Sequence, residues 1–529
     1  MFRSVNNPIP TIARFIPLRR WRVHRRELIK AGLSLPLAGL AGGGLPWAAM
    51  AAAGPGRAFD AATVPGLARA LAAKPYRPAD ADLPEALARI KYDTYRDIRF
   101  DPKQALWKAE GLPFQLQFFH RAFLFKHRVD IHRVHGGLAT PVVYRPQMFG
   151  FGSAPKPTQD DLGFAGFRVH APINRGDYFD EVCAFLGVSY FRAVAKDLLY
   201  GLSARGLALN TGAGNSEEFP VFTGFWIEQP AAGAKQIIVH ALMDSPSVSG
   251  AMRFAITPGT ETVFDTQLRL YPRVALDRVG IAPLTSMYHF DATDRVGVDD
   301  FRPAVHDSDG LALHNGAGEQ IWRPLRNPKT LQESAFQDRR PRAFGLMQRK
   351  RGFADYADSE AHYERRPSLW VEPVGDWGEG AVHLIEIPTG DEYHDNIVAF
   401  WRPRAPLAAG REHRYDYRLH WCAKHAWKPA QATVSRTRIG AGNGAARRIV
   451  IDLDGGRLGQ LAADAKPRAV VWASAGRIAN AIAHPNTGTG GWRMSFELEP
   501  GTARSVELRA VLEDGDGPLS ETWLYRWTA

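Results

Sequence analysis

The sequence predicts an all-β protein with a large N-terminal β-sandwich followed by a small C-terminal one. Apolar and polar residues alternate with a period of two in several segments, as in strands that bury one face. Gly and Pro interrupt the chain about every 10–15 residues, which is typical of short strands joined by turns. Aromatic residues reach 11%, with 14 Trp, and these side chains favour packed β-structure.

The composition excludes several other classes of protein. At 529 residues the chain exceeds one ordinary domain, and 45% hydrophobic with 23% charged residues is a globular composition. Disordered, collagenous and coiled-coil proteins are therefore excluded. Outside the N-terminus no run of about 18 uncharged apolar residues occurs, which excludes a polytopic membrane protein.

The net charge of +11 does not indicate nucleic-acid binding, because the charge is concentrated at the N-terminus. Residues 1–51 hold eight of the 66 Lys and Arg residues and one of the 55 acids. The remaining 58 basic and 54 acidic residues give a net charge of +4, with no basic stripe and no nucleic-acid-binding motif.

Residues 1–51 are predicted to be an export signal. Arg25 and Arg26 form a twin arginine, and an apolar, uncharged stretch over residues 31–47 follows them. Small residues at positions 49–53 offer cleavage sites, so the segment is typical of a signal that the Tat translocase reads. A single membrane anchor is the alternative, which the short length and the many glycines disfavour. We expect a mature periplasmic protein that starts near residue 52.

Three short helices are expected. Residues 62–73 and 82–90 carry apolar side chains at helical spacing, and the second segment begins with an Asp and a Pro that suit a helix start. A third helix is expected from Asp177, with Val182 and Phe185 on one face.

Strands dominate from about residue 112 onward. Residues 264–270 alternate strictly, and residues 236–243 and 380–387 are short apolar runs. We assign these segments to the N-terminal domain, residues 52–401.

A second domain is expected at the C-terminus. A polar, Pro-containing segment at residues 402–410 predicts a linker, and residues 411–529 form the domain that follows it. Alternation recurs over residues 415–421, 492–498 and 506–510, which indicates a small antiparallel sandwich, Ig-like in size.

The sequence lacks the common signatures of metal and cofactor chemistry. Its two cysteines, Cys183 and Cys422, lie far apart without Cys/His ligand spacing, and we expect buried free thiols. No dinucleotide or phosphate loop, no HExxH and no GxSxG motif occurs. We therefore expect neither a metal nor a cofactor.

Two acid-rich segments are candidates for catalysis. In the first, Asp307 and Asp309 flank a serine in a turn-rich run. The second, residues 389–396, places three acids, among them Glu392 and Asp395, before an apolar strand. Crowded like charges raise one another's pKa, which a general acid needs. Each segment by itself is equally compatible with a structural role, as an Asx-turn or a solvated hairpin loop.

Aromatic and basic residues in the segment 363–373 suggest a sugar as the ligand. Tyr363, Arg366 and Trp370 lie close together in this segment. Aromatic rings cover the apolar faces of pyranose rings, while Arg and acids bond to hydroxyls. Two carboxylates suffice for glycoside hydrolysis, one to protonate the leaving oxygen and one to activate water.

Several long motifs resemble the periplasmic glucan biosynthesis proteins G and D. The resemblance extends from about residue 57 to the C-terminus, and the Tat-type signal is similar to that of the D branch. The motifs are DLGFAGFR (161–168), GVSYFRA (187–193), YGLSARG (200–206), GIAPLTSM (280–287), HDSD (306–309), RPSLWVEP (366–373) and SETWLY (520–525).

The resemblance implies a galactose-mutarotase-like N-terminal sandwich followed by an Ig-like domain. It also implies a role in shaping the glucose backbone of osmoregulated periplasmic glucans, and kinship with inverting endo-β-1,2-glucanases. Carried over by motif, Asp395 would be the general acid and Asp307 the general base, with Tyr363 ordering a chain of waters. The candidates for substrate contact are Arg366, Trp370, Glu392 and Asp309.

Three functions follow from the resemblance. The first is an inverting β-1,2-glucan hydrolase that trims nascent glucan, which the presence of both acids favours. The second is a non-catalytic glucan-binding scaffold that works with the membrane glucosyltransferase, and the third is a transglycosylase or a branching factor. For the hydrolase we expect Asp307 and Asp395 to line one groove, wider apart than the roughly 5–5.5 Å of a retaining enzyme. The segment after Trp421 is shorter than in D-type relatives, which bears on chain-length preference.

Overall fold

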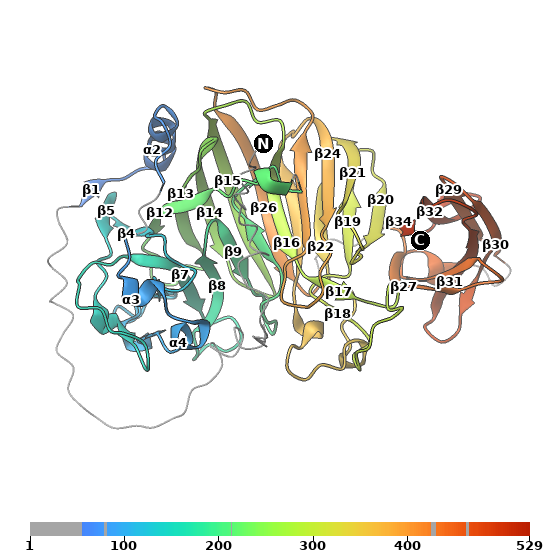
Figure 1. Cartoon of the computed structure of the whole chain (residues 1–529), viewed down its shortest axis with the longest axis horizontal. Coiled ribbons are helices and arrows are strands. Elements are labelled where there is room, and N and C mark those ends of the chain that lie inside the picture. Colours follow the sequence, from blue (N-terminus) through green and yellow to red (C-terminus); the bar gives the residue numbers. More distant parts are fainter. Residues whose placement is uncertain (1–55, 79–81, 213, 425–429, 462–464) are drawn as a thin grey trace, which may run out of the picture. The chain divides into compact units, whose positions relative to one another are not determined.

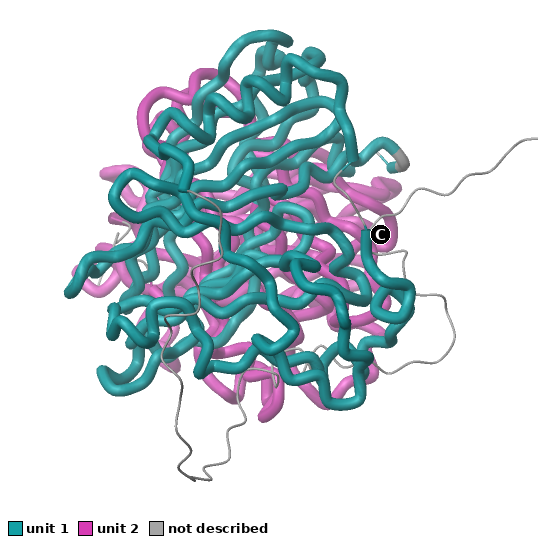
Figure 2. The backbone as a smooth tube through the Cα atoms, turned by 90° about the vertical axis from the view of Figure 1, so that its left-hand side faces the viewer, with its two compact units in different colours: residues 1–283, 400–422 teal, residues 284–399, 423–529 magenta. Residues whose placement is uncertain are grey.

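β-strands form nearly all of the regular structure (Figure 1), so the all-β sandwich class that the sequence predicts is confirmed. The computed structural model describes residues 56–78, 82–212, 214–424, 430–461 and 465–529, and the predicted export signal lies outside them. Figure 2 shows two compact units. Unit 1 comprises Met1–Pro283 and Phe400–Cys422, and unit 2 comprises Leu284–Ala399 and Ala423–Ala529.

Unit 1 contains strands of two sheets. In spatial order the first has β1 (Arg57–Ala58), β5 (Leu138–Pro141), β4 (Asp130–His135), β12 (Val221–Glu228), β13 (Ile237–Asp244), β14 (Val248–Thr257), β15 (Glu261–Pro272) and β26 (His413–Cys422). The second has β16 (Val279–Ser286), β10 (Ser203–Arg205), β9 (Tyr190–Ala193), β8 (Asp180–Leu186), β7 (Phe164–Ala171) and β3 (Gln115–His120). The last three residues of β16 belong to unit 2. Smaller strands are β11 (Ala208–Leu209), which pairs with β16, and the pair β2 (Arg99–Phe100) and β6 (Phe149–Gly150).

Aromatic rings fill the space between the two sheets of unit 1. Phe191 on β9 lies 5.0 Å from Phe254, 5.9 Å from Phe264 and 6.1 Å from Trp421, measured between ring centroids. Strict alternation places Phe264 and Leu268 of β15 inside, as the period of two predicts, because successive side chains of a strand point to opposite faces.

Helices are few and short in the described residues. The predicted helices near 62–73 and 82–90 are found as α2 (Thr63–Ala72) and α3 (Glu85–Ala88), and α4 (Tyr92–Arg96) follows. Short 3-10 turns are η3 (Pro102–Gln104), η4 (Pro146–Met148), η5 (Gly214–Ser216), η6 (Phe353–Asp355), η7 (Tyr363–Arg365) and η8 (Leu458–Gln460).

The helix predicted from Asp177 is wrong, because that segment forms strand β8. Its residues 182–185 are all buried, on both faces of the strand, and β8 pairs with β7 and β9. A short apolar run buried on both sides has no period of two, so it cannot be distinguished from one face of a helix by its pattern alone.

The structure also moves the predicted domain boundary. Strand β26, assigned from sequence to the C-terminal domain, pairs along its whole length with β15 in unit 1. Within the expected linker 402–410, Leu407 is buried and exchanges two backbone hydrogen bonds with Leu276, at 2.9 and 3.0 Å. The C-terminal β-structure therefore begins after Cys422. Alternation indicates that one face of a strand is exposed and the other buried, but it does not identify the neighbouring strand.

Both cysteines are buried free thiols, as predicted. Burial raises the pKa of Cys183. Cys422 ends β26, so both residues belong to unit 1 rather than to different domains.

Unit 2 contains the C-terminal sandwich and the loops of the candidate site. One sheet has β23 (Ser368–Val374), β22 (Ala343–Met347), β19 (Gly310–His314), β20 (Gln320–Pro324), β34 (Thr522–Thr528), β32 (Ser505–Asp514) and β29 (Arg468–Ala473), with β33 (Gly517–Pro518) beside β32. Another holds β21 (Gln332–Arg339), β24 (Glu379–Glu386) and the first residues of β25 (Ile397–Pro403), which from Phe400 onward belongs to unit 1. A four-stranded sheet has β27 (Thr433–Ala441), β28 (Arg447–Asp454), β31 (Gly491–Glu499) and β30 (Arg477–Asn486), and β17 (Tyr288–Phe290) pairs with β18 (Val305–His306).

The C-terminal sandwich shares its core with the strands that precede it. Ile451, Phe496 and Trp523 form one hydrophobic cluster that also includes Trp322 and Trp370 from β20 and β23. Strand β20 pairs in parallel with β34, so the sheet continues across the two segments. In the described part of the chain no helix is long and apolar enough to cross a membrane.

Candidate functional site

A short strand in unit 2 brings both predicted acid-bearing segments together. The Asp307 N–H donates to the Met287 carbonyl at 2.8 Å. The Asn396 side chain binds the next residue: its oxygen accepts from the Tyr288 N–H at 2.8 Å, and its NH2 group donates to the Tyr288 carbonyl at 2.9 Å. Asp307 and Asp395, the residue before Asn396, are therefore anchored to two adjacent residues at the start of β17.

The two acids differ in exposure and surroundings. Asp307 is completely buried, whereas Asp395 is exposed. The Nη1 atom of Arg366 lies 2.9 Å from Oδ1 of Asp307, and Arg366 is itself held by a bond from Nη2 to the Ala361 carbonyl at 3.1 Å. Pairing with a cation offsets part of the free-energy cost of burying a carboxylate.

Tyr363 connects the two acid-bearing segments. The Arg366 guanidinium lies over the Tyr363 ring, 4.8 Å from its centroid. The Tyr363 hydroxyl donates to Oε2 of Glu392 at 3.1 Å. One ring thus contacts both the partner of Asp307 and the loop that carries Asp395.

Arg302 organises the acids around this loop. Its Nη1 donates to Oε2 of Glu392 at 2.6 Å and to Oδ2 of Asp358 at 2.9 Å. Its Nη2 donates to Oδ2 of Asp300 at 2.7 Å. Burial alone would lower the pKa of Arg302, but the three carboxylates raise it, so the guanidinium stays charged. Arg302 is not among the residues that the sequence predicts for the site, because two of its partners lie 56 and 90 positions away.

Separate partners hold two of the three crowded acids of the loop 389–396. Oδ1 of Asp391 lies 2.9 Å from Nδ1 of His394, while Glu392 is bound by Arg302 and Tyr363. Individual pairing weakens the mutual repulsion on which the sequence-based argument for a general acid relied.

Gln348 fixes His306 and Tyr363 relative to each other. Its Oε1 lies 2.9 Å from Nδ1 of His306, and its Nε2 donates to the carbonyls of His306 and Tyr363 at 3.0 and 3.1 Å. The His306 ring also stacks on Tyr288, with centroids 5.4 Å apart. Sequence reasoning missed Gln348, since a single Gln in a strand end carries no motif.

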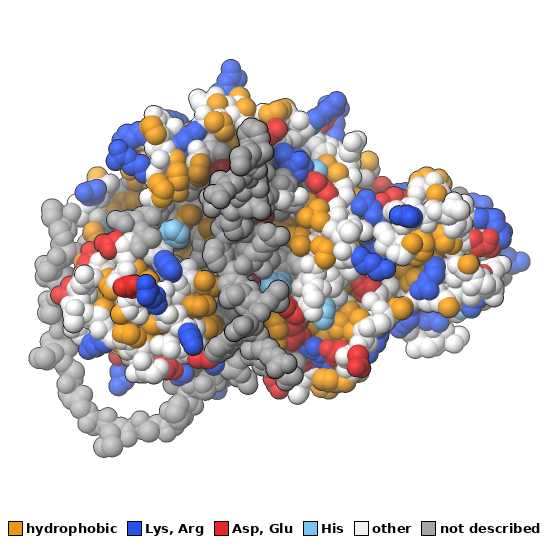
Figure 3. Space-filling model, in the orientation of Figure 1, with side chains coloured by type: hydrophobic (Ala, Val, Ile, Leu, Met, Phe, Trp, Pro, Cys, Tyr) orange, Lys and Arg blue, Asp and Glu red, His pale blue; other side chains and the backbone are white. Residues whose placement is uncertain are grey.

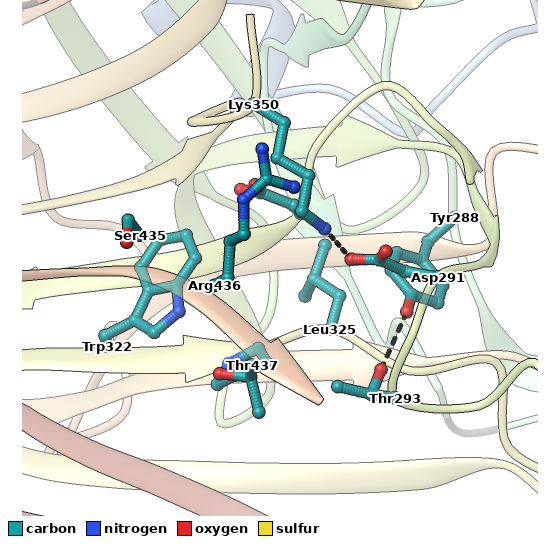
Figure 4. Close-up of a pocket in the computed structure, with 11 residues that line it drawn as sticks. Tyr288, Asp291, Thr293, Trp322, Leu325, Lys350, Ser435, Arg436 and Thr437 are labelled. Atoms are coloured by element: carbon teal, nitrogen blue, oxygen red, sulfur yellow. Dashed lines mark hydrogen bonds and ion pairs between the residues drawn. The ribbon is translucent and has the colours of Figure 1, made fainter. Parts of the chain in front are cut away.

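Asp309 faces a different pocket of unit 2, shown in Figure 4. Both of its carboxylate oxygens accept from the Arg349 N–H at 3.3 Å, which fixes the turn. The pocket is lined by Tyr288, Asp291, Thr293, Asp309, Trp322, Pro324, Leu325, Lys350, Ser435, Arg436 and Thr437.

Two acids beside this pocket have opposite pKa shifts. Lys350 forms an ion pair with Asp291 (Figure 4), and Nε2 of His306 lies 3.8 Å from Oδ2 of Asp291. Burial alone would raise the pKa of Asp291, but Lys350 and His306 lower it well below its usual range. Burial raises the pKa of Asp294 to about 6. Neither acid belongs to a motif from which the sequence predicts a role.

Trp370 lies in the C-terminal core rather than on a surface that a ligand reaches. It is 5% exposed and belongs to the cluster that contains Trp322 and Trp523. The substrate contact expected from its motif therefore lacks an exposed ring face, and packing explains the residue.

The site thus combines a buried acid, held beside an Arg, with an exposed acid on a second loop. This arrangement suits a proton acceptor and a proton donor that work from different positions. The separation of the two carboxylates stays a prediction. Among the described residues, no group of three or more His, Cys, Asp or Glu side chains is placed to hold a metal ion.

Comparisons with known proteins agree with the motifs. Residues 59–527 match the family model described as "Periplasmic glucan biosynthesis protein, MdoG". The chain is 56% identical over 462 residues to glucans biosynthesis protein G of Rhodopseudomonas palustris, which covers 87% of this chain and 92% of that protein. It is 53% identical over 471 residues to the protein of the same name from Vibrio cholerae, covering 87% and 85%. These relatives are named G, and the choice of the D branch from the N-terminal signal stays a prediction.

Proposed function

The chain belongs to the periplasmic glucan biosynthesis protein family, and on this premise we propose that it sets the glucose backbone of osmoregulated periplasmic glucans by inverting endo-hydrolysis of β-1,2-linked chains. The observation that carries the proposal is the joint attachment of the Asp307 and Asp395 segments to residues 287 and 288, with Arg366 and Tyr363 between them.

Asp307 is the general base in this proposal. It pairs with Arg366, and in this role its carboxylate accepts a proton. Because Asp307 is completely buried, it does not contact a sugar in an open groove, and the proton of the attacking water reaches it through ordered waters. Tyr363, whose hydroxyl bonds to Glu392, orders that chain in this proposal.

Asp395 is the general acid. It is exposed, on a loop whose backbone is held by the three bonds of the Asn396 side chain to Tyr288 and Ile387. A fixed loop with an exposed carboxyl can present a proton to the leaving oxygen of a bound chain. Water attacks from the opposite face, so the new reducing end is released as the α anomer.

A second candidate function is a non-catalytic glucan-binding scaffold that partners the membrane glucosyltransferase. The complete burial of the Asp307–Arg366 pair favours it, because a buried ion pair also serves purely to hold a fold. The two candidates differ in whether glucan is cut, and only the hydrolase requires the carboxyl of Asp395.

The proposal includes export to the periplasm by the Tat translocase, with the mature chain starting near residue 52. The twin arginine supports this route. Replacing Arg25→Lys together with Arg26→Lys should leave folded precursor in the cytoplasm, and normal periplasmic yield of this double variant would contradict the route.

The test is to incubate the mature protein with linear β-1,2-glucan and to size the products by chromatography. Asp307→Asn and Asp395→Asn should each slow cleavage by at least about 100-fold, the usual contribution of a positioned acid or base. The matched control is Asp391→Asn in the same loop as Asp395, which should cleave at a normal rate.

Glucan binding should survive both Asn variants, and NMR of the first product should show the α anomer. Unchanged cleavage by either variant would remove that residue from the mechanism. A β product would overturn inversion, and binding of glucan without any cleavage by the natural protein would favour the scaffold.

A further inference from the structure

Trp472 is the one exposed tryptophan among the eleven that the structure describes. Nine of the others are buried and Trp527 is half-buried, whereas Trp472 is 57% exposed. It lies on β29, where Val471 packs on the C-terminal core and Val470 points outward with Trp472. Large aromatic rings are normally buried, so an outward-facing Trp on a regular strand is a candidate contact residue.

The neighbours of Trp472 supply polar groups in fixed positions. Trp472 lies opposite Arg509 on β32, and Arg509 lies opposite Leu524 on β34. Directly opposite residues have Cβ atoms about 4.5–5.5 Å apart, so these three side chains form one row on the outer face. Nη2 of Arg509 donates to Oε1 of Glu319 at 2.6 Å, and the Thr522 hydroxyl donates to the same oxygen at 2.7 Å. We call Val470, Trp472, Arg509, Leu524 and Glu319 the Trp472 face.

The charges of this face are balanced. Arg509 pairs with Glu319, and the next outward-facing residues, Arg526 and Glu507, pair with each other. On the side that Figure 3 shows, hydrophobic and basic side chains are interspersed over the C-terminal strands. A balanced surface suits a neutral ligand better than an anionic one, such as a lipid headgroup or a nucleic acid.

The apolar area is small for a protein partner. The exposed parts of Val470 and Trp472 amount to roughly 200 Å², given the usual size of such side chains. A stable protein interface buries about 800 Å² on each partner. A single exposed ring beside an ion pair fits a ligand of the size of one sugar ring.

We propose that the Trp472 face binds one pyranose ring of a neutral glucan chain, as a contact separate from Asp307 and Asp395. The indole covers the apolar face of the sugar, while the free donors of Arg509 and the carboxylate of Glu319 bond to its hydroxyls. The identity of the ligand as a glucan rests on the proposed function. The contact adds binding strength for long chains without taking part in cleavage.

The test compares Trp472→Ala with Trp472→Phe, each made in the Asp395→Asn protein so that the probe, linear β-1,2-glucan, is not consumed. Isothermal titration should show about threefold to tenfold weaker binding for Trp472→Ala, the range expected for one lost aromatic contact. Trp472→Phe should retain most of the affinity. Tyr178→Ala, which removes another exposed aromatic ring, is the matched control and should bind normally.

Each outcome decides one question. Unchanged binding by Trp472→Ala overturns the Trp472 face, whether or not the natural protein cleaves glucan. A change of sedimentation mass in Trp472→Ala would identify the face as a contact between copies of the chain, which also overturns the proposal. Failure of the proposed hydrolysis shows itself differently: the natural protein then binds glucan without cutting it, and a loss of binding in Trp472→Ala still supports the face.

Discussion

The interior of unit 1 and the charged cluster around Arg302 and Arg366 in unit 2 are both buried, but opposite interactions hold them together. In unit 1 the rings of Phe191, Phe254 and Phe264 pack against one another. In unit 2 buried charges pair, as Arg302 does with three carboxylates and Arg366 with Asp307. Dispersion contacts are many and non-directional, whereas a buried charge depends on a few partners. We therefore expect a substitution in the charged cluster to lower the free energy of unfolding more than a substitution in the interior of unit 1.

The largest expected effect is the removal of the charge of Arg302. Arg302→Met keeps much of the volume but leaves Asp300, Asp358 and Glu392 without their shared cation. Removing one partner of a buried ion pair lowers the free energy of unfolding by about 3–5 kcal/mol. Urea unfolding of the mature protein should detect this loss.

The control for this change is Arg340→Met, also in unit 2. Arg340 and Asp376 form an exposed pair, at 3.4 Å, with more than half of each side chain in solvent. Exposed ion pairs contribute little to stability, so this variant should have the same free energy of unfolding as the natural protein. Equal losses in the two variants would contradict the distinction between buried and exposed pairing.

An intermediate effect should appear in the pH dependence of stability through Asp294. Its pKa is raised to about 6 by burial, from an ordinary value near 3.8. Below about pH 4 the carboxyl is protonated in both the folded and unfolded chain. As the pH rises to 6, the unfolded chain loses this proton while the folded chain largely keeps it. The free energy of unfolding therefore falls by up to about 2–3 kcal/mol.

Comparison of the natural protein with Asp294→Asn isolates this contribution, because other groups titrate alike in both. The unfolding free energy of the natural protein minus that of the variant should fall between about pH 4 and pH 6. A difference that is flat over this range would show that Asp294 titrates normally.

The smallest expected effect lies in the aromatic interior of unit 1. Phe191→Leu removes part of one ring among several neighbours that can close over the gap, so the loss should be about 1–2 kcal/mol. Phe353→Leu, at an exposed position, is the control and should leave stability unchanged. A loss for Phe191→Leu as large as that for Arg302→Met would remove the contrast between the two interiors.

The strands with a clear alternating or apolar pattern could be predicted from the sequence. Residues 264–270 alternate, and the structure buries Phe264, Leu268 and Leu270 completely. The prediction failed at β8, where both faces are buried and the period of two disappears. It also failed at β26, because the pattern of a strand does not identify its neighbour.

The candidate site could be predicted only in part. The carboxylates, Tyr363 and Arg366 were selected because acids, aromatic rings and Arg in short motifs have chemical meaning of their own. Arg302 and Gln348 were missed, since their importance comes from bonds to residues far away in the chain. Trp370 was selected for its motif, but the fold places it in a core.

What the sequence determined by itself is local: the all-β class, the strand faces, the short helices near residues 63 and 85, and the kinds of side chain available for chemistry. These follow from periodicity and residue type, which act between near neighbours. The tertiary structure decided the rest. It placed β26 beside β15, buried Asp307 against Arg366 while leaving Asp395 exposed, and gathered three acids around Arg302. Pairing and burial depend on which distant segments meet, and no single segment of the chain encodes that meeting.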